Sequence, residues 1–511
     1  MPTLPPLDLA IVAVYVLGMT LVGAWFTSRQ KDLKTYFVGG RDVGWFMVLV
    51  SIVATETSAV TFLSVPGLAY KPAGGDFTFL QLTIGYVLGR CLVAWVLLPL
   101  YMRGDLFSAY EILRQRFSPA VQRVASGLFL VTRTLADGLR LFLTALLLMN
   151  ALGVSFELAV LLTGSVTVVY TYLGGMKAVL WTDLVQFVIK IAGAALAGVF
   201  VLRLLPGGWD AYLAAGESAG KFRVFEWGFD PASDANVWAG VIGGAVFSMA
   251  SHGADQLMVQ RYLCAKSLPH ARVALVLSGF TVMAQFVLFL GVGAGLDALR
   301  RAGLFDPGAA KPDEVFGLFI VTALPTGVKG VLVAAVLAAA MSTLSSSLNS
   351  SANALVTDFY RPLRPGRDEP HYVRLSRLMT AGWGLAQMGV ALAAWQLGGD
   401  TSVVKRVLAV AGFTTGLLLG LFLLGTLPVR VSSRAAIAGL ATGFVVVFLA
   451  WLPGTGVTAP VDWLPAGLRK PILAWPWYAP LGAGTTVGVA LLLSRLLPAN
   501  GPAATPGHRS P

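Results

Sequence analysis

Charged residues are scarce in this sequence. Asp, Glu, Lys and Arg make up only 12% of its 511 residues, whereas hydrophobic residues make up 56%. A soluble domain usually has about 25% charged residues, so this chain has too little charge to cover a surface in water. Lipid must therefore surround most of it. Only helices and closed barrels satisfy their backbone polar groups in lipid.

Cysteine and histidine are also rare. The two cysteines, Cys91 and Cys264, lie in or beside apolar runs and form neither a disulfide framework nor a metal motif. The four histidines do not cluster, and an enzyme would need a nucleophile–base pair or metal ligands. We therefore expect no enzyme activity. The net charge of +12 does not indicate a nucleic-acid partner, because the basic residues lie in short loops between apolar runs.

The apolar runs are about twenty residues long, the length that a helix needs to span a bilayer. A barrel would show alternation over segments of about ten residues. We therefore predict an all-α polytopic membrane protein with about 13 transmembrane helices. The first run has no basic residue before it and no evident cleavage site, so we expect it to be retained. The predicted spans are 7–27, 45–70, 78–101, 121–150, 156–173, 179–204, 238–262, 272–296, 328–357, 373–397, 404–427, 433–451 and 475–497.

Basic residues gather in alternate loops, at 29–41, 103–123, 261–272, 361–377 and 430–434. Cytoplasmic loops carry such an excess, so we expect the N-terminus outside and the C-terminus in the cytoplasm of a cell that holds the chain in its inner or plasma membrane. Ten helices after the first form two groups of five. Because five is odd, the groups can be inverted repeats, a common transporter plan.

This plan predicts the domain boundaries. The predicted parts are a first helix with its cytoplasmic loop (1–43), a core (44–430) with repeats 44–205 and 237–430, two peripheral helices (431–497) and a disordered tail (498–511).

The second span has a polar interruption at Thr55, Glu56, Thr57 and Ser58. Hydroxyl side chains compete with the helix for backbone groups, and a carboxylate at mid-membrane costs about 2.5–3.5 kcal/mol. We interpret this segment as an unwound helix that lines a cavity, with carbonyl oxygens suited to a hard cation. The alternative is an ordinary helix that packs small residues.

A polar stripe follows one face of the span at 328–357. Ala339, Ser342, Thr343 and Ser346 have the spacing of one helix face. Neutral oxygen ligands suit a monovalent hard cation. A serine-rich helix face that only packs against a neighbouring helix would have the same sequence pattern. Asp183 lies inside another apolar run. An intramembrane carboxylate indicates a functional site; the alternative is a carboxylate at a helix end, within reach of water at the lipid headgroups.

Three charges lie near the middle of the fourth span, at Arg133, Asp137 and Arg140. They must face a cavity or one another. An arginine there could bind a carboxylate with two hydrogen bonds. An internal network that only braces the bundle is equally compatible with the sequence.

Four stretches together resemble the sodium:solute symporter family, whose members include sodium–galactose, sodium–proline and sodium–sialic acid transporters. They are Ser58 to Phe62, Gly174 to Gln186, Asp255 to Ser267 and Met341 to Ser345. The resemblance extends from the first span to about the eleventh. It implies the inverted five-plus-five repeat of the LeuT-like fold, and alternating access.

The resemblance also implies one or two co-transported Na+ ions. The first sodium site would use backbone oxygens of Ala54, Thr57 and Ala339 with the hydroxyls of Ser342 and Thr343. The second would use Asp183 with Ser342, Ser345 and Ser346.

For the substrate, the resemblance implies positions beside the broken helix, to which the fourth span adds its three charges. The predicted substrate residues are Glu56, Ser58, Thr61, Gln81, Thr83, Tyr86, Arg133, Asp137, Arg140, Ser248, Ser251 and His252. Sugar carriers resemble one another in having Asn at the place of Glu56 and Glu near Thr83. Neither is present, which makes a sugar less suitable.

The resulting prediction is sodium-coupled symport of a small polar solute, a carboxylate or zwitterion such as an organic acid or amino acid. A sodium-coupled sugar or polyol symporter and a non-transporting membrane sensor remain as alternatives. The expected partners are the solute, sodium ions and the lipid bilayer, with a monomer as the working expectation for the oligomeric state.

Overall fold

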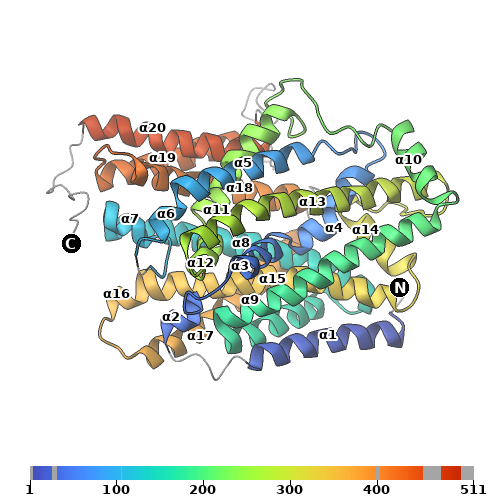
Figure 1. The fold of residues 1–511 in the computed structure, drawn as a ribbon, viewed down its shortest axis with the longest axis horizontal. Coiled ribbons are helices and arrows are strands. Elements are labelled where there is room, and N and C mark those ends of the chain that lie inside the picture. Colours follow the sequence, from blue (N-terminus) through green and yellow to red (C-terminus); the bar gives the residue numbers. More distant parts are fainter. Residues whose placement is uncertain (1–3, 26–31, 105, 398–402, 453–472, 497–511) are drawn as a thin grey trace.

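The chain folds into a bundle of helices (Figure 1). The structure is a computed structural model that describes residues 4–25, 32–104, 106–397, 403–452 and 473–496. Within these ranges there is no β-strand, and Val43 and Ala265 form an isolated bridge. The predicted all-helical architecture is confirmed, whereas the predicted tail lies outside the described residues.

Every predicted span falls on one or more helices. The longer elements are α1 (Pro6–Trp25), α3 (Trp45–Glu56), α4 (Ala59–Tyr70), α5 (Leu80–Val96), α8 (Pro119–Leu152), α9 (Phe156–Leu204), α11 (Gly244–Gly253), α13 (Leu268–Arg301), α15 (Val328–Ala354), α17 (Glu369–Leu397), α18 (Val403–Thr426), α19 (Ser433–Trp451) and α20 (Tyr478–Leu496). The shorter elements are α2 (Leu33–Val38), α6 (Leu98–Tyr101), α7 (Glu111–Arg116), α10 (Gly208–Ser218), η2 (Ala239–Gly243), α12 (Gln256–Leu263), α14 (Pro312–Thr322), η3 (Leu355–Tyr360), α16 (Arg361–Leu363) and η6 (Trp475–Trp477).

The span at 45–70 is broken, as its polar interruption predicts. α3 ends at Glu56 and α4 begins at Ala59, with a bend of 63° between them. Thr57 and Ser58 have non-helical backbone angles. A helix end leaves its last carbonyl groups without partners inside the helix, so the break exposes backbone oxygens of α3 to side chains of other helices.

A second break divides the span at 238–262, which the sequence analysis treated as continuous. α11 ends at Gly253, and Asp255 caps α12 by accepting a hydrogen bond from the Leu257 amide at 2.8 Å. The broken pair α3–α4 opens the first group of five helices, and α11–α12 opens the second. Interrupted helices at matching positions of two halves are typical of inverted-repeat transporters.

The spans 156–173 and 179–204 meet at a sharp kink in α9. Gly175 there has φ 57° and ψ −167°, angles that a residue without Cβ adopts most readily. The criterion of about twenty apolar residues does not find α10 and α14, because each has only 11 residues.

α15 forms the centre of the bundle. All residues from Leu332 to Ala354 are buried, including the polar stripe. The outside of the bundle is apolar, as Val14, Leu17 and Leu21 on α1 illustrate. Six described helices are long and apolar enough to cross a membrane, and the bent pair α3–α4 makes a possible seventh.

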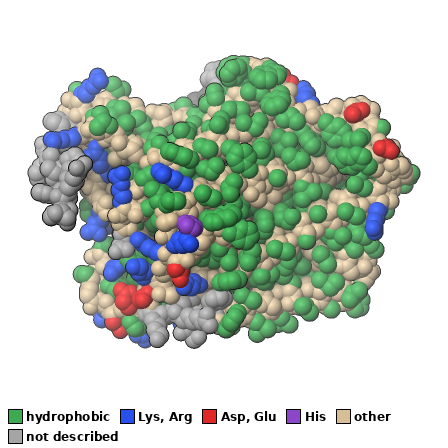
Figure 2. Space-filling model, in the orientation of Figure 1, with side chains coloured by type: hydrophobic (Ala, Val, Ile, Leu, Met, Phe, Trp, Pro, Cys, Tyr) green, Lys and Arg blue, Asp and Glu red, His purple; other side chains and the backbone are tan. Residues whose placement is uncertain are grey.

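The basic loops meet at one end of the bundle. Arg41 donates to the Gly104 carbonyl at 3.0 Å, and the Leu33 amide donates to Glu369 at 3.0 Å. α2 and α16 lie at this end in Figure 1, whereas α10 and α14 lie toward the other. Figure 2 shows hydrophobic side chains over the middle of one face and most Lys and Arg side chains toward the first end.

The close packing of α4 against α13 provides a test. A Cβ atom at Gly293 would lie 1.9 Å from the Pro66 carbonyl oxygen, so we expect Gly293→Ala to destabilise the protein by about 1–3 kcal/mol through overpacking. Gly382→Ala is the matched control, since nothing lies within 4 Å of its added Cβ. Thermal unfolding in detergent compares the two. Equal melting temperatures would contradict the described packing.

Candidate functional site: a cavity at the helix break and two oxygen sets

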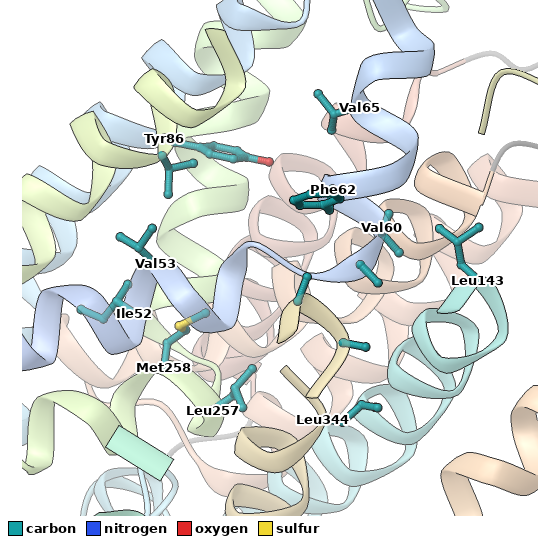
Figure 3. Close-up of a cluster of buried hydrophobic side chains, with 14 of the residues drawn as sticks. Ile52, Val53, Val60, Phe62, Val65, Tyr86, Leu143, Leu257, Met258 and Leu344 are labelled. Atoms are coloured by element: carbon teal, nitrogen blue, oxygen red, sulfur yellow. The ribbon is translucent and has the colours of Figure 1, made fainter. Parts of the chain in front are cut away.

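A cavity of about 130 Å³ lies at the break between α3 and α4. Val60, Val65, Phe79 and Phe286 form part of its apolar wall. Figure 3 shows the interrupted ribbon, with Tyr86 and Val65 on one side of it and Leu257 and Met258 on the other. Sites for drug-sized ligands usually have about 300–1,000 Å³, so this cavity fits a smaller solute.

Eight of the twelve residues predicted for the substrate line the cavity. They are Glu56, Ser58, Thr61, Tyr86, Arg133, Arg140, Ser251 and His252. They come from α3, the break, α4, α5, α8 and α11, so the structure brings together residues that are far apart in the sequence.

The other four are not lining residues. The hydroxyl of Ser248 donates to the Tyr86 carbonyl at 3.0 Å, and that of Thr83 to the Leu80 carbonyl at 2.7 Å. The Gln81 amide donates to the Thr78 carbonyl at 2.9 Å, and Asp137 is fully buried against the arginines of α8. These four position neighbouring groups.

Glu56 forms an ion pair that the sequence analysis did not foresee. One Arg90 nitrogen lies 2.6 and 2.5 Å from the two Glu56 oxygens, and another donates to the Ser278 hydroxyl at 2.7 Å. His252 lies 3.6 Å from Glu56 and 3.0 Å from the Ser251 hydroxyl. The carboxylate at the helix break is therefore largely neutralised by the protein itself.

The three charges of α8 belong to a four-residue network. Arg133 binds Asp255, the capping residue of the second broken helix, and lies 3.7 Å from Asp137. Arg140 binds Asp137. Asp137 is therefore shared between two guanidinium groups, and Arg140 has no second carboxylate within 4.0 Å among the described residues. Because both arginines line the cavity, the network braces the bundle and also presents positive charge to a solute.

The oxygens predicted for the first sodium site do converge. The Ser342 hydroxyl lies 2.9 Å from the Ala54 carbonyl oxygen and 3.2 Å from that of Ala339. The Thr343 hydroxyl lies 3.4 Å from the Ala339 oxygen. This set therefore joins the broken end of α3 to α15.

A lysine of α9 already binds this set. The Lys190 ammonium group lies 2.5 Å from the Ala54 oxygen, 3.0 Å from the Thr57 oxygen and 3.2 Å from the Ser342 hydroxyl. Two unit charges 4 Å apart repel each other by about 4 kcal/mol at an effective dielectric constant of about 20. A sodium ion therefore does not fit this set together with the ammonium group.

Of the residues predicted for the second sodium site, Asp183 and Ser346 are linked through Arg261. The Ser51 hydroxyl donates to one Asp183 oxygen, Oδ2, at 2.5 Å, and Arg261 lies 3.6 Å from the same oxygen. Arg261 also binds the Ser346 hydroxyl, whereas Ser345 donates to the Ser342 carbonyl at 3.2 Å. The other carboxylate oxygen, Oδ1, is buried without a hydrogen-bond partner in the described part of the chain. An orphaned oxygen of a buried carboxylate fits a small cation.

Arg90 and Lys190 are the site residues that the sequence analysis missed. Both lie inside predicted spans, in the runs 78–101 and 179–204. The rule that singled out Asp183, that an ionisable residue within a span indicates function, identifies both of them as well.

Comparisons with known proteins agree with this geometry. A model of the sodium:solute symporter family matches residues 36–443. The chain belongs to this family. This is a family of multi-pass membrane transporters.

Two family members illustrate the similarity. Sodium-coupled monocarboxylate transporter 2 of Bos taurus is 29% identical over 451 residues, which cover 86% of this chain and 72% of that protein. Sodium/sialic acid symporter SiaT of Proteus mirabilis (strain HI4320) is 28% identical over 459 residues, covering 87% and 89%.

A solved structure of another symporter of this kind confirms the fold. The substrate-bound, outward-open state of a Na+-coupled sialic acid symporter has a TM-score of 0.84 and 26% sequence identity, covering 96% of this chain and 98% of that chain. The predicted LeuT-like class, with its five-plus-five helix plan, is therefore confirmed.

The pairing of Glu56 with Arg90 gives a stability prediction. Arg90 is fully buried, so Glu56→Gln leaves an uncompensated guanidinium and should destabilise the protein by about 3–5 kcal/mol. The double variant Glu56→Gln/Arg90→Met removes both charges and should recover most of this loss. Thermal unfolding in detergent measures both variants.

The exposed Glu217 provides the control for this experiment. Glu217→Gln should change stability by less than about 0.5 kcal/mol. A double variant less stable than Glu56→Gln would mean that Arg90 does not depend on the carboxylate.

Proposed function

We propose that this chain is a secondary active transporter that carries a small organic carboxylate in symport with sodium, by alternating access. The observation that carries the proposal is Arg140, a guanidinium that lines the cavity and shares its one carboxylate partner with Arg133. Arginine suits carboxylate recognition because its planar fork can form two parallel hydrogen bonds.

A carboxylate fits better than a zwitterion. The cavity's acidic side chains are already paired, since Glu56 binds Arg90 and Asp255 binds Arg133. A substrate ammonium group would find no unpaired carboxylate among these residues. The related proteins named above carry monocarboxylates and sialic acid, which supports an acidic solute. The volume of about 130 Å³ favours a short one.

Sodium is the coupling ion named for both relatives. We propose that it binds in this chain at the second predicted oxygen set, called the Asp183 set, which consists of Asp183, Ser342, Ser345 and Ser346. Asp183 Oδ1 is a buried carboxylate oxygen without a hydrogen-bond partner among the described residues. Because Arg261 lies near the other carboxylate oxygen, sodium would bind on the Oδ1 side.

We also propose the repeat boundaries, the orientation in the membrane and the oligomeric state. The repeats are residues 44–205 and 237–430, with a peripheral helix before them and two after them. The gathering of basic loops at one end of the bundle supports a cytoplasmic C-terminus. The chain acts as a monomer in the cell membrane and is a carrier without catalytic activity.

The carboxylate specificity can be tested by binding. Acetate, propionate, lactate and pyruvate should each be tested with purified protein in sodium buffer, by thermal shift and calorimetry. Arg140→Ala should weaken binding of the best of them by about 10–100-fold, because a hydrogen bond to a charged group contributes about 1.5–3 kcal/mol. Arg140→Lys should recover only part of the loss.

The control variant is Arg203→Ala, which removes an exposed arginine of α9 and should leave binding unchanged. Binding that stays intact in both Arg140→Ala and Arg133→Ala would overturn the carboxylate proposal.

A further inference from the structure

We propose that the ammonium group of Lys190 takes the place of a sodium ion at the first oxygen set, so that this set works with a tethered cation. The inference rests on the proposed function, because it concerns the ions of the same transport cycle. It leaves the Asp183 set as the only one of the two predicted sets that can exchange a sodium ion with solution.

The geometry matches the ammonium group to the set. An ammonium group has three N–H donors and no acceptor. Lys190 has three oxygen acceptors within 3.2 Å, the carbonyls of Ala54 and Thr57 and the hydroxyl of Ser342. Two of these are backbone oxygens at the broken end of α3, and the third comes from the polar stripe of α15. They are three of the five oxygens predicted for sodium.

The electrostatics point the same way. Lys190 is fully buried, and no carboxylate of the described residues lies within 4.0 Å of its ammonium group. A buried charge is very costly unless polar groups compensate it. The compensation here comes from the oxygen set, from the partial negative charge at the C-terminal end of α3, and from the charge of Asp183 on the same helix as Lys190. The set therefore stabilises a cation, and the protein supplies that cation itself.

This arrangement has a consequence for transport. A co-transported ion must leave its site during the cycle, whereas Lys190 is fixed to α9. The first set can therefore brace the break between α3 and α4 but cannot draw energy from a sodium gradient. Symport would use one sodium ion fewer than a protein in which both sets bind sodium.

Sodium binding can be measured without any substrate. The full chain is purified in detergent and its melting temperature is followed as sodium chloride replaces choline chloride at constant ionic strength. Asp183→Asn removes the carboxylate of the second set. We expect this variant to show no saturable rise in melting temperature with sodium.

The double variant Asp183→Asn/Lys190→Ala vacates the first set and should gain a saturable, sodium-dependent rise. Adding Ser342→Ala should abolish that rise. The matched control is Asp183→Asn/Lys177→Ala, which removes a partly exposed lysine of the same helix that pairs with Asp42 and should show no sodium response.

Two results would overturn the inference. One is a saturable sodium response in Asp183→Asn that Ser342→Ala abolishes, because sodium would then bind the first set with Lys190 present. This comparison keeps Lys190 and so decides the matter even if the lysine variants do not fold. The other is a folded double variant without any sodium response. Failure of carboxylate binding would instead count against the proposed function, since no carboxylate is present in this assay.

Discussion

The break between α3 and α4 is the constraint on which the site depends. It frees the carbonyls of Ala54 and Thr57 from the helix, and freed backbone oxygens inside a membrane need partners. Lys190 and Ser342 provide them from α9 and α15. The same break creates the cavity, places Glu56 at its edge and lets Arg90 of α5 reach that carboxylate. One interruption therefore connects four helices and sets both the solute cavity and the cation set.

The charged side chains around the break pair with one another. Glu56 is paired with Arg90, and Arg133 joins Asp137 of its own helix to Asp255 at the second break. The two broken helices are therefore both tied to the cavity by arginine side chains. Arg140 shares its carboxylate partner, Asp137, with Arg133. Its guanidinium group can therefore also bind the carboxylate of a solute. Lys190 supplies the positive charge at the neighbouring oxygen set.

Much of the fold could be predicted from span lengths and from polar interruptions. The interruption at Thr55 to Ser58 predicted the break in α3–α4, and the spacing from Ala339 to Ser346 predicted a buried polar face of α15. The break before Asp255 was missed, although the stretch from Ser251 to Asp255 is a polar, glycine-containing interruption of the apolar run, and α14 was missed because it is too short. The pairs Glu56–Arg90 and Lys190–Ser342 could not be predicted, since each joins residues of separate helices and depends on how those helices pack.

The central claim is that this member of the sodium:solute symporter family couples carboxylate uptake to sodium through a single exchangeable site. The most direct measurement is uptake of a radiolabelled monocarboxylate into proteoliposomes, with sodium or choline outside. The account predicts accumulation above the external concentration only under an inward sodium gradient, with a stoichiometry of one sodium ion per carboxylate. Absence of accumulation under that gradient, or a stoichiometry of two sodium ions, would contradict it.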